Sequence, residues 1–263
     1  MQDPVLQQLE EGLLTITLNI PERRNALSAS VADALLEAVH RAKDDRLVRA
    51  VLLTGAGGTF CVGGDVKRMA DDKQPPLSFE AKNALMRRTM HITRIIHEMN
   101  RPVVAAVEGA AAGAGLSIAL ACDFRVVGES AKITTAFAKI AVSGDYGGIY
   151  YLTKMVGSAR ARELMLHSPV LSGREAHALG LMSRVVPDAE VGAAAHEMAA
   201  ALARGPTVAL GYLKTNINNA EDSSLEAYLD AEATYQCRCL QTADYQEAAS
   251  AFVQKRTPTF VGR

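Results

Sequence analysis

The chain has 263 residues, of which 49% are hydrophobic and 22% are charged, values typical of a globular protein with a sizeable core. Its formal net charge of −1 argues against a nucleic-acid-binding surface on bulk charge. We expect no membrane span, because no uncharged apolar run is long enough to cross a bilayer, and no signal peptide at the acidic N-terminus. The cysteines lack metal-ligand spacing, so we expect reduced thiols, no metal site and a cytoplasmic location.

Strands and helices are expected to alternate up to about residue 190. The expected strands cover residues 12–20, 48–54, 102–107, 124–127 and 183–186. The expected helices cover residues 29–43, 78–99, 115–121, 148–156 and 172–180. Further along, the pattern is only helical, with breaks at residues 205–206 and 222–224. This order predicts an α/β or α+β core followed by a C-terminal helical module.

The stretch RPVVAAVEGAAAGAGLSIALACD, residues 101–123, joins a buried strand to a buried helix through small residues only. Small residues at such a turn let a ligand approach the backbone closely. The first turn of a helix also carries unpaired N–H groups and the positive end of the helix dipole. The turn therefore suits an anion or a developing oxyanion. A tight packing joint between strand and helix, without any ligand, explains the same pattern about as well.

Two further glycine-rich turns occur at residues 61–65 and 143–148. The first follows a buried strand and precedes a helical start, as the 110–115 turn does. If these two lie side by side, one N–H from each can point at one oxygen, and such an oxyanion hole is worth about 3–4 kcal/mol per donor in a transition state. The turn at 143–148 supplies Asp145 at the start of a helix, where plain helix capping is the competing explanation.

Several motifs resemble the enoyl-CoA hydratase/isomerase family, the crotonase superfamily: FCVGGDVK at residues 60–67, the 101–123 stretch, and the later pattern VGSARARELML with LSGREAHALGLMSRVVP. The similarity extends from about Leu13 to Arg263. It implies a spiral of ββα units that binds acyl-CoA, here residues 1–200, and a C-terminal helical trimerisation module, residues 201–263. It also implies a homotrimer or a dimer of trimers.

By this resemblance, the thioester enolate oxygen is expected to bind the N–H groups of Gly64 and Ala114, although most relatives have glycine at the second position. Hydratases of the family use two glutamates, and the matching positions here hold Ser117 and, approximately, Lys139. Asp145 instead matches the position used by family members with a single acid, among them the phenylacetate-pathway isomerase group. A lone carboxylate can remove a proton α to a thioester and return it elsewhere, which is isomerisation.

The resemblance also implies how coenzyme A is bound. Its ADP part is expected near Arg24, Ala26 and Lys67. Lys255 is expected to reach it from the C-terminal segment of the same chain or of a neighbouring one. Basic residues suit this group because coenzyme A carries three phosphates. Coenzyme A arrives as part of the substrate, so no separate cofactor is expected.

The sequence thus favours an acyl-CoA isomerase in which Asp145 carries the proton. Three alternatives stay open. One is an enoyl-CoA hydratase that uses Asp145 together with water or with an acid not identified from sequence. Another is a dehalogenase or thioester hydrolase in which the same aspartate is a nucleophile. The last is a protein that binds CoA esters without turning them over.

Overall fold

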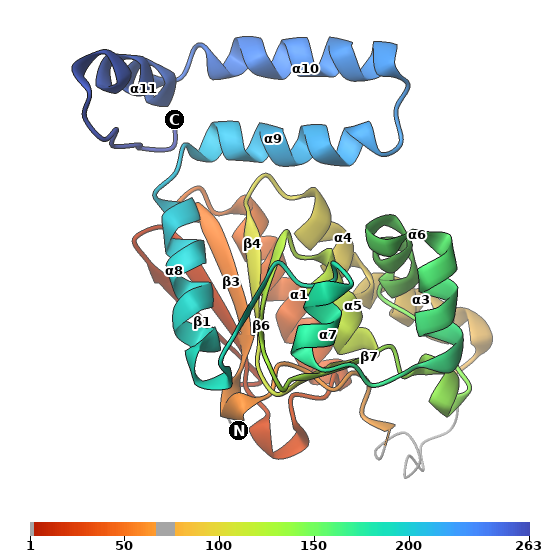
Figure 1. Ribbon diagram of the computed structural model, residues 1–263. Coiled ribbons are helices and arrows are strands. Elements are labelled where there is room, and N and C mark those ends of the chain that lie inside the picture. The colour runs from red at the N-terminus through yellow and green to blue at the C-terminus, as the bar shows by residue number, and fades with distance from the viewer. Residues whose placement is uncertain (1–2, 67–76) are drawn as a thin grey trace.

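A six-stranded sheet forms the centre of the molecule, with the strand order β1-β2-β3-β4-β6-β8 (Figure 1). The structure, a computed structural model, describes residues 3–66 and 77–263. The strands are β1 (Val5–Glu10), β2 (Leu13–Leu18), β3 (Ala50–Gly55), β4 (Val103–Val107), β6 (Phe124–Gly128) and β8 (Arg184–Val186). β1 is antiparallel to β2, and the other neighbours are parallel. β5 (Ala110–Ala112) and β7 (Lys132–Thr134) form a separate parallel pair.

β1 is an element that the sequence analysis did not anticipate. Glu10 pairs with Leu13, so Glu11 and Gly12 form a two-residue hairpin turn. Both turn residues have positive φ, 47° and 83°, as a tight turn between twisted antiparallel strands requires. β1 lacks the alternation of apolar and polar residues that predicts a strand, because only Val5 in this strand is buried.

The core helices that the structure describes from end to end follow from local signals and packing. They are α1 (Ala29–Asp44), α3 (Phe79–Thr89), α4 (His91–Glu98), α5 (Ala114–Ala121), α6 (Gly148–His167), α7 (Gly173–Ala178) and α8 (Val191–Ala203). Side chains of Ser28, Ser78 and Ser172 cap α1, α3 and α7. Two predictions were wrong. The helix expected over 78–99 divides at Met90, and the helix expected to end at residue 156 continues past a non-helical Gly157 (φ 73°).

The two faces of the sheet are covered differently. Helices α1, α4 and α5 pack on one face and build the larger core, which includes Leu35, Ile92 and Ile118. Among the described helices, α8 packs on the other face through small residues such as Ala195 and Ala199 (Figure 1). β4 is buried along its whole length. Its continuous apolar sequence predicts this, because a central parallel strand is covered on both faces.

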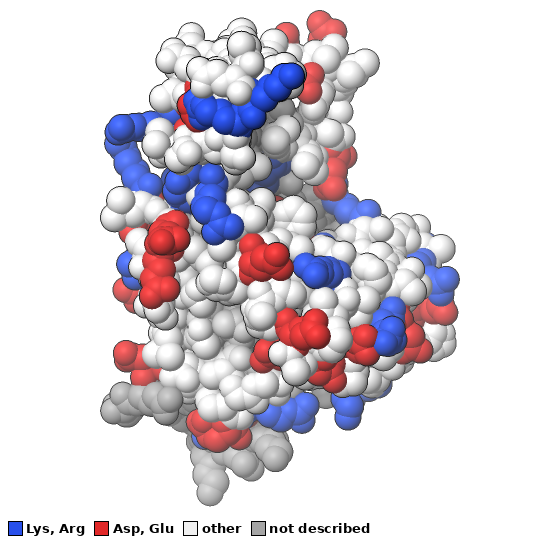
Figure 2. All heavy atoms as spheres, turned by 60° about the vertical axis from the view of Figure 1, so that its left-hand side comes forward, with Lys and Arg blue, Asp and Glu red and all other residues white. Residues whose placement is uncertain are grey.

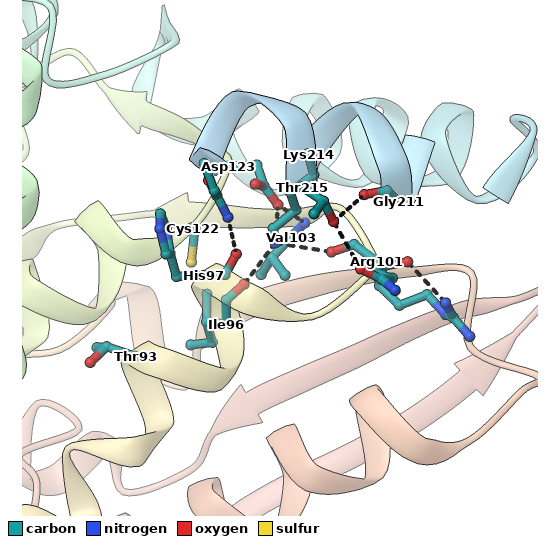
Figure 3. Close-up of polar contacts among 12 residues, drawn as sticks. Thr93, Ile96, His97, Arg101, Val103, Cys122, Asp123, Gly211, Lys214 and Thr215 are labelled. Atoms are coloured by element: carbon teal, nitrogen blue, oxygen red, sulfur yellow. Dashed lines mark hydrogen bonds and ion pairs between the residues drawn. The ribbon is translucent and has the colours of Figure 1, made fainter. Parts of the chain in front are cut away.

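Three C-terminal helices stand off from the sheet: α9 (Thr207–Ala220), α10 (Leu225–Cys239) and α11 (Ala243–Gln254) (Figure 1). Lys214 of α9 attaches them to the core (Figure 3). Its ammonium donates to the Asp123 carboxylate at 2.8 Å and to the main-chain oxygens of Ile96 and Arg101 at 2.7 and 3.1 Å. The predicted division at residues 200/201 falls inside α8 and remains a prediction.

Charged side chains of both signs are interspersed on the face that carries α8 and the C-terminal helices (Figure 2). No continuous basic surface is visible on this face. Within residues 3–66 and 77–263, no helix is both long and apolar enough to cross a bilayer.

Candidate active site

The two glycine-rich turns expected to hold an oxyanion lie side by side. Cys61 forms an isolated parallel bridge with Ala111. Its N–H donates to the Ala110 oxygen at 3.1 Å, and its own oxygen accepts from the Ala112 N–H at 3.0 Å. The chain after Cys61 therefore runs directly along the start of α5.

Two glycines make this approach possible. A Cβ on Gly63, whose φ is +84°, would lie 2.7 Å from the Ala112 oxygen and 3.2 Å from the Ala114 nitrogen. A Cβ on Gly115 would lie 2.3 Å from the Cys61 oxygen. Both distances to oxygen are shorter than a side chain tolerates, so the close packing depends on glycine at both positions.

The main-chain amides of Gly64 and Ala114 are both available as donors. Ala114 is the first residue of α5, and its N-cap Gly113 (φ 51°) contributes no side-chain cap. Within the described part of the chain, neither the Gly64 nor the Ala114 N–H donates a hydrogen bond to another group. A Cβ on Gly63 would lie 3.2 Å from the Ala114 nitrogen, so the Gly64 and Ala114 amides belong to adjacent turns, as a shared oxyanion hole requires.

Asp145 lies in the third turn, just before α6. Its Oδ1 is buried and has no hydrogen-bond partner among the described residues. Burial raises the pKa of this carboxyl from 3.8 to about 6. The capping explanation is wrong, because the N-cap of α6 is Gly147 and no side chain caps that helix. Asp145 is thus a half-buried carboxyl whose Oδ1 has no hydrogen-bond partner among the described residues and whose pKa, about 6, is close to neutral pH.

The Asp145 turn packs against α5, the helix that begins at the second glycine-rich turn. A Cβ on Gly148 would lie 2.2 Å from the Ser117 Oγ, one helical turn along α5 from Ala114. The charge of Asp145 also acts on Cys61, although burial is the main reason why the pKa of that thiol rises to about 12. Cys61 therefore stays protonated and is not a nucleophile. The first and third turns thus both lie against the first four residues of α5, which follow the second turn.

The positions that match the hydratase glutamates hold no carboxylate. Ser117 is 1% exposed, and its hydroxyl donates to the Gly113 oxygen at 3.2 Å. Lys139 lies on an exposed 3-10 turn, Phe137–Ile140. Among the residues that the structure describes, no group of His, Cys, Asp and Glu could hold a metal ion.

Arg24 and Ala26 lie beside the first glycine-rich turn. The Arg24 oxygen accepts from the Val62 N–H at 3.3 Å, and Leu27 donates to the Gly63 oxygen at 2.8 Å. Arg24 is exposed, whereas Ala26 is 6% exposed. Lys67, the third residue expected near the ADP group, lies outside the described residues.

An ion pair at this turn was not foreseen. Arg23 approaches the Asp65 carboxylate at 2.9 Å and ties the Pro21–Arg23 turn to the residue that follows Gly64. Nothing local in the sequence pairs residues so far apart. The sequence shows only that PERRN contains two adjacent arginines. It does not indicate which of them pairs with an acid.

Lys255 is placed far from these turns within its own chain. It ends α11 in a left-handed conformation (φ 55°) and is exposed. In Figure 1, α11 lies at the upper left, beside α10 and apart from α5. The expected role of Lys255 at the coenzyme A site, from the same chain or a neighbouring one, stays a prediction.

Residues 8–263 match the profile of the enoyl-CoA hydratase/isomerase family. The chain belongs to this family. It is 37% identical, over 263 residues and 100% of both chains, to the 1,2-epoxyphenylacetyl-CoA isomerase of Escherichia coli K12. It is 38% identical, over 256 residues and 97% of both chains, to a Rhodobacter capsulatus protein named "Probable enoyl-CoA hydratase".

A solved family structure has the same fold. The enoyl-CoA hydratase from Polaromonas sp. JS666 superposes with a TM-score of 0.90 at 33% identity, covering 97% of this chain and 99% of that one. The resemblance and the crotonase-like α/β fold expected from the sequence are thereby confirmed. The relatives include proteins named for isomerisation and for hydration, so the family alone does not select the reaction.

Proposed function

We propose that this enzyme is an acyl-CoA isomerase that uses a single carboxylate. The observation that carries the proposal is Asp145, whose buried oxygen has no partner among the described residues and whose turn packs against α5, the helix that begins at Ala114. A pKa of about 6 suits a group that must both take and return a proton near neutral pH. The E. coli relative of this chain is named as an isomerase.

In the proposed reaction, ionised Asp145 removes the proton on C2 of a 3-enoyl-CoA thioester. The electron pair moves onto the thioester oxygen, which accepts hydrogen bonds from the Gly64 and Ala114 amides. Protonated Asp145 then delivers the proton to C4, the double bond shifts to C2–C3, and the carboxylate is regenerated. Only a proton moves, so the reaction requires no cofactor besides the coenzyme A of the substrate.

The packing of Ser117 supports isomerisation over hydration. Addition of water across the double bond is usually managed by two acids, and Ser117 occupies one of their positions. Space beside it is short, because even a Cβ added to Gly148 of α6 would lie 2.2 Å from the Ser117 hydroxyl. The second candidate function is hydration, favoured by the R. capsulatus relative's name.

We further propose that Arg24, Ala26 and Lys67 line the site of the ADP group, and that Lys255 reaches it from a neighbouring chain. The distance of α11 from α5 in Figure 1 supports reach between chains rather than within one. Exposed apolar residues on the C-terminal helices, such as Leu213 and Ile217 of α9, support assembly into a trimer or dimer of trimers.

The test compares wild type with Asp145→Asn in two assays, isomerisation of a 3-enoyl-CoA and hydration of crotonyl-CoA. We expect isomerisation to dominate and to fall at least ~10²-fold in the variant, because amide cannot carry the proton. Hydration that dominates and survives the substitution would contradict the proposal. CoA-ester binding without product in either assay, with 1,2-epoxyphenylacetyl-CoA added to the panel, would instead indicate a non-catalytic binding protein.

A further inference from the structure

The segment that follows α11, residues 257–263, turns back along that helix and returns to the start of α9 (Figure 1). Gly262 in this segment has a φ of +79°, and a Cβ there would lie 3.0 Å from the Thr207 hydroxyl and 3.3 Å from the Arg49 Nε. Thr207 is the first residue of α9, and Arg49 directly precedes β3. Residues 257–263, called the strap below, therefore connect α11 to the start of α9 and to the central sheet.

Two acids of α11 hold the strap along the helix. Asp244 is 2% exposed, and its carboxylate accepts from the main-chain N–H groups of Val261 at 2.7 Å and Gly262 at 2.9 Å. Glu247, further along the helix, accepts from the Thr259 N–H at 2.9 Å. Hydrogen bonds to ionised groups are stronger than those between neutral groups, so we expect the strap and α11 to move together.

Arg49 holds the strap from the side of the core. Its Nε donates to the Thr207 hydroxyl at 2.9 Å, and its Nη2 donates to the main-chain oxygens of Gly205 at 2.7 Å and Phe260 at 3.2 Å. Its stem lies against Gly12, where a Cβ would be 2.8 Å from the Arg49 Cδ. Because a guanidinium carries several N–H donors in one rigid plane, this side chain bonds the α8–α9 connection, the start of α9 and the strap at once.

Helix α11 buries little of its own surface. Its buried residues are Asp244 and Ala251, whereas Phe252 and Val253 are 86% and 81% exposed. Lys255 follows the helix directly and is exposed. An element with few buried apolar contacts opens easily, so the bonds of the strap carry much of what keeps α11, and with it Lys255, in place.

We propose that Arg49 and Asp244 are positioning residues: through the strap they fix α11 on the core, and so set the place from which Lys255 reaches the coenzyme A site of a neighbouring chain. This rests on the reach of Lys255 proposed above. Neither residue touches the reacting atoms, and Asp145 lies in the core. Loss of either should therefore weaken the binding of coenzyme A and raise KM, with kcat unchanged.

The test measures hydrogen exchange of the α11 amides by mass spectrometry and binding of free coenzyme A by calorimetry, in wild type, Arg49→Met and Asp244→Ala. Lys255→Ala gives the effect of removing the amine itself. Arg49→Lys keeps the charge and the stem of the side chain but not the planar fork. Asp44→Ala is the matched control for Asp244→Ala, because Asp44 is an exposed carboxylate of α1.

We expect exchange in α11 to be at least ~10-fold faster in Arg49→Met and in Asp244→Ala, because main-chain groups of the strap lose their partners. Both substitutions should weaken coenzyme A binding by about the factor seen in Lys255→Ala, without adding to it in double variants, and raise KM in the same ratio. Arg49→Lys should restore part of the slow exchange. Asp44→Ala should match wild type in every measurement.

Slow exchange in α11 in both Arg49→Met and Asp244→Ala would overturn the proposal, because the strap would then not hold the helix. Fast exchange with unchanged coenzyme A affinity would also overturn it, as would an affinity that survives Lys255→Ala. If Asp244→Ala does not fold, Arg49→Met and Arg49→Lys decide by the same criteria. The exchange measurement requires no turnover, so activity that survives Asp145→Asn would reject the proposed reaction without altering this result.

Discussion

Gly115 is the residue at which the two glycine-rich turns come closest, since a Cβ there would lie 2.3 Å from the Cys61 oxygen and 2.8 Å from its Cβ. We expect Gly115→Ala to destabilise the fold by about 1–3 kcal/mol or more and to separate the Gly64 and Ala114 amides. Chemical denaturation and kcat measure the two effects.

Gly192 in α8 provides the control for that substitution. The nearest atom to a Cβ there is the Glu108 carboxylate at 3.5 Å, an ordinary contact. Gly192→Ala should stabilise by up to about 0.5–1 kcal/mol, because alanine loses less chain entropy in a helix. Equal effects of the two substitutions would mean that the turns do not depend on glycine at position 115.

Ionised Asp145 should lower the stability of the folded protein. Its folded pKa, about 6, exceeds the ordinary 3.8, so between these values the folded chain holds a proton that the unfolded chain has lost. Stability from this group therefore falls as pH rises through that window. Asp145→Asn removes the effect, and we expect it to be more stable than wild type above pH 6.

The gain in Asp145→Asn should not exceed about 3 kcal/mol, and it should be less to the extent that solvent reaches the carboxyl. Thermal melts of both proteins at pH 4 and pH 8 measure it. The expected result is a difference in Tm that is larger at pH 8. A wild type that is the more stable protein at pH 8 would contradict the raised pKa.

At the scale of elements, a buried ion pair helps to join α9 to the core. Lys214 is 8% exposed, and Asp123, its partner, also accepts from the Val103 N–H at 2.7 Å (Figure 3). Lys214→Met should cost about 3–5 kcal/mol, because it leaves the Asp123 carboxylate partly buried without its cation. Urea denaturation measures the loss, and limited proteolysis should release the C-terminal helices more readily.

Lys154 of α6 is the matched control, because it also pairs with two acids, Glu221 at 3.1 Å and Asp222 at 2.9 Å, but at the surface. Lys154→Met should change stability little, since exposed pairs contribute little in water. Comparable losses in the two variants would show that burial of the Lys214 pair is not what holds α9.

At the scale of the whole molecule, the C-terminal helices expose apolar side chains that a soluble monomer does not require. Leu213 and Ile217, four residues apart on α9, are 57% and 65% exposed. We expect the double substitution Leu213→Asp/Ile217→Asp to dissociate the assembly, measured by light scattering after gel filtration. Leu47→Asp, at a loop residue 70% exposed, should leave the mass unchanged.

The same variant tests the reach of Lys255. If Lys255 serves the site of a neighbouring chain, dissociation should raise KM for CoA thioesters by about the factor seen in Lys255→Ala, and the two changes should not add. A dissociated variant with an unchanged KM, or a Lys255→Ala that still loses affinity after dissociation, would contradict this arrangement.

The sequence alone determined features that depend on near neighbours in the chain. The apolar run of β4, the serine caps of α1 and α7, and the order of strands and helices follow from patterns a few residues long. The glycine-rich turns and Asp145 were visible for the same reason. The resemblance to the family was inferred from motifs, such as residues 60–67 and 101–123, that contain these turns.

Only the tertiary structure decided how the turns act together. The close approach of Gly148 to Ser117 and the burial of the Asp145 oxygen both depend on segments distant in sequence. The separation of Lys255 from α5 is likewise a property of how the helices are arranged (Figure 1). A carboxyl's pKa depends on how much water surrounds it, and no local pattern states which distant segments exclude that water.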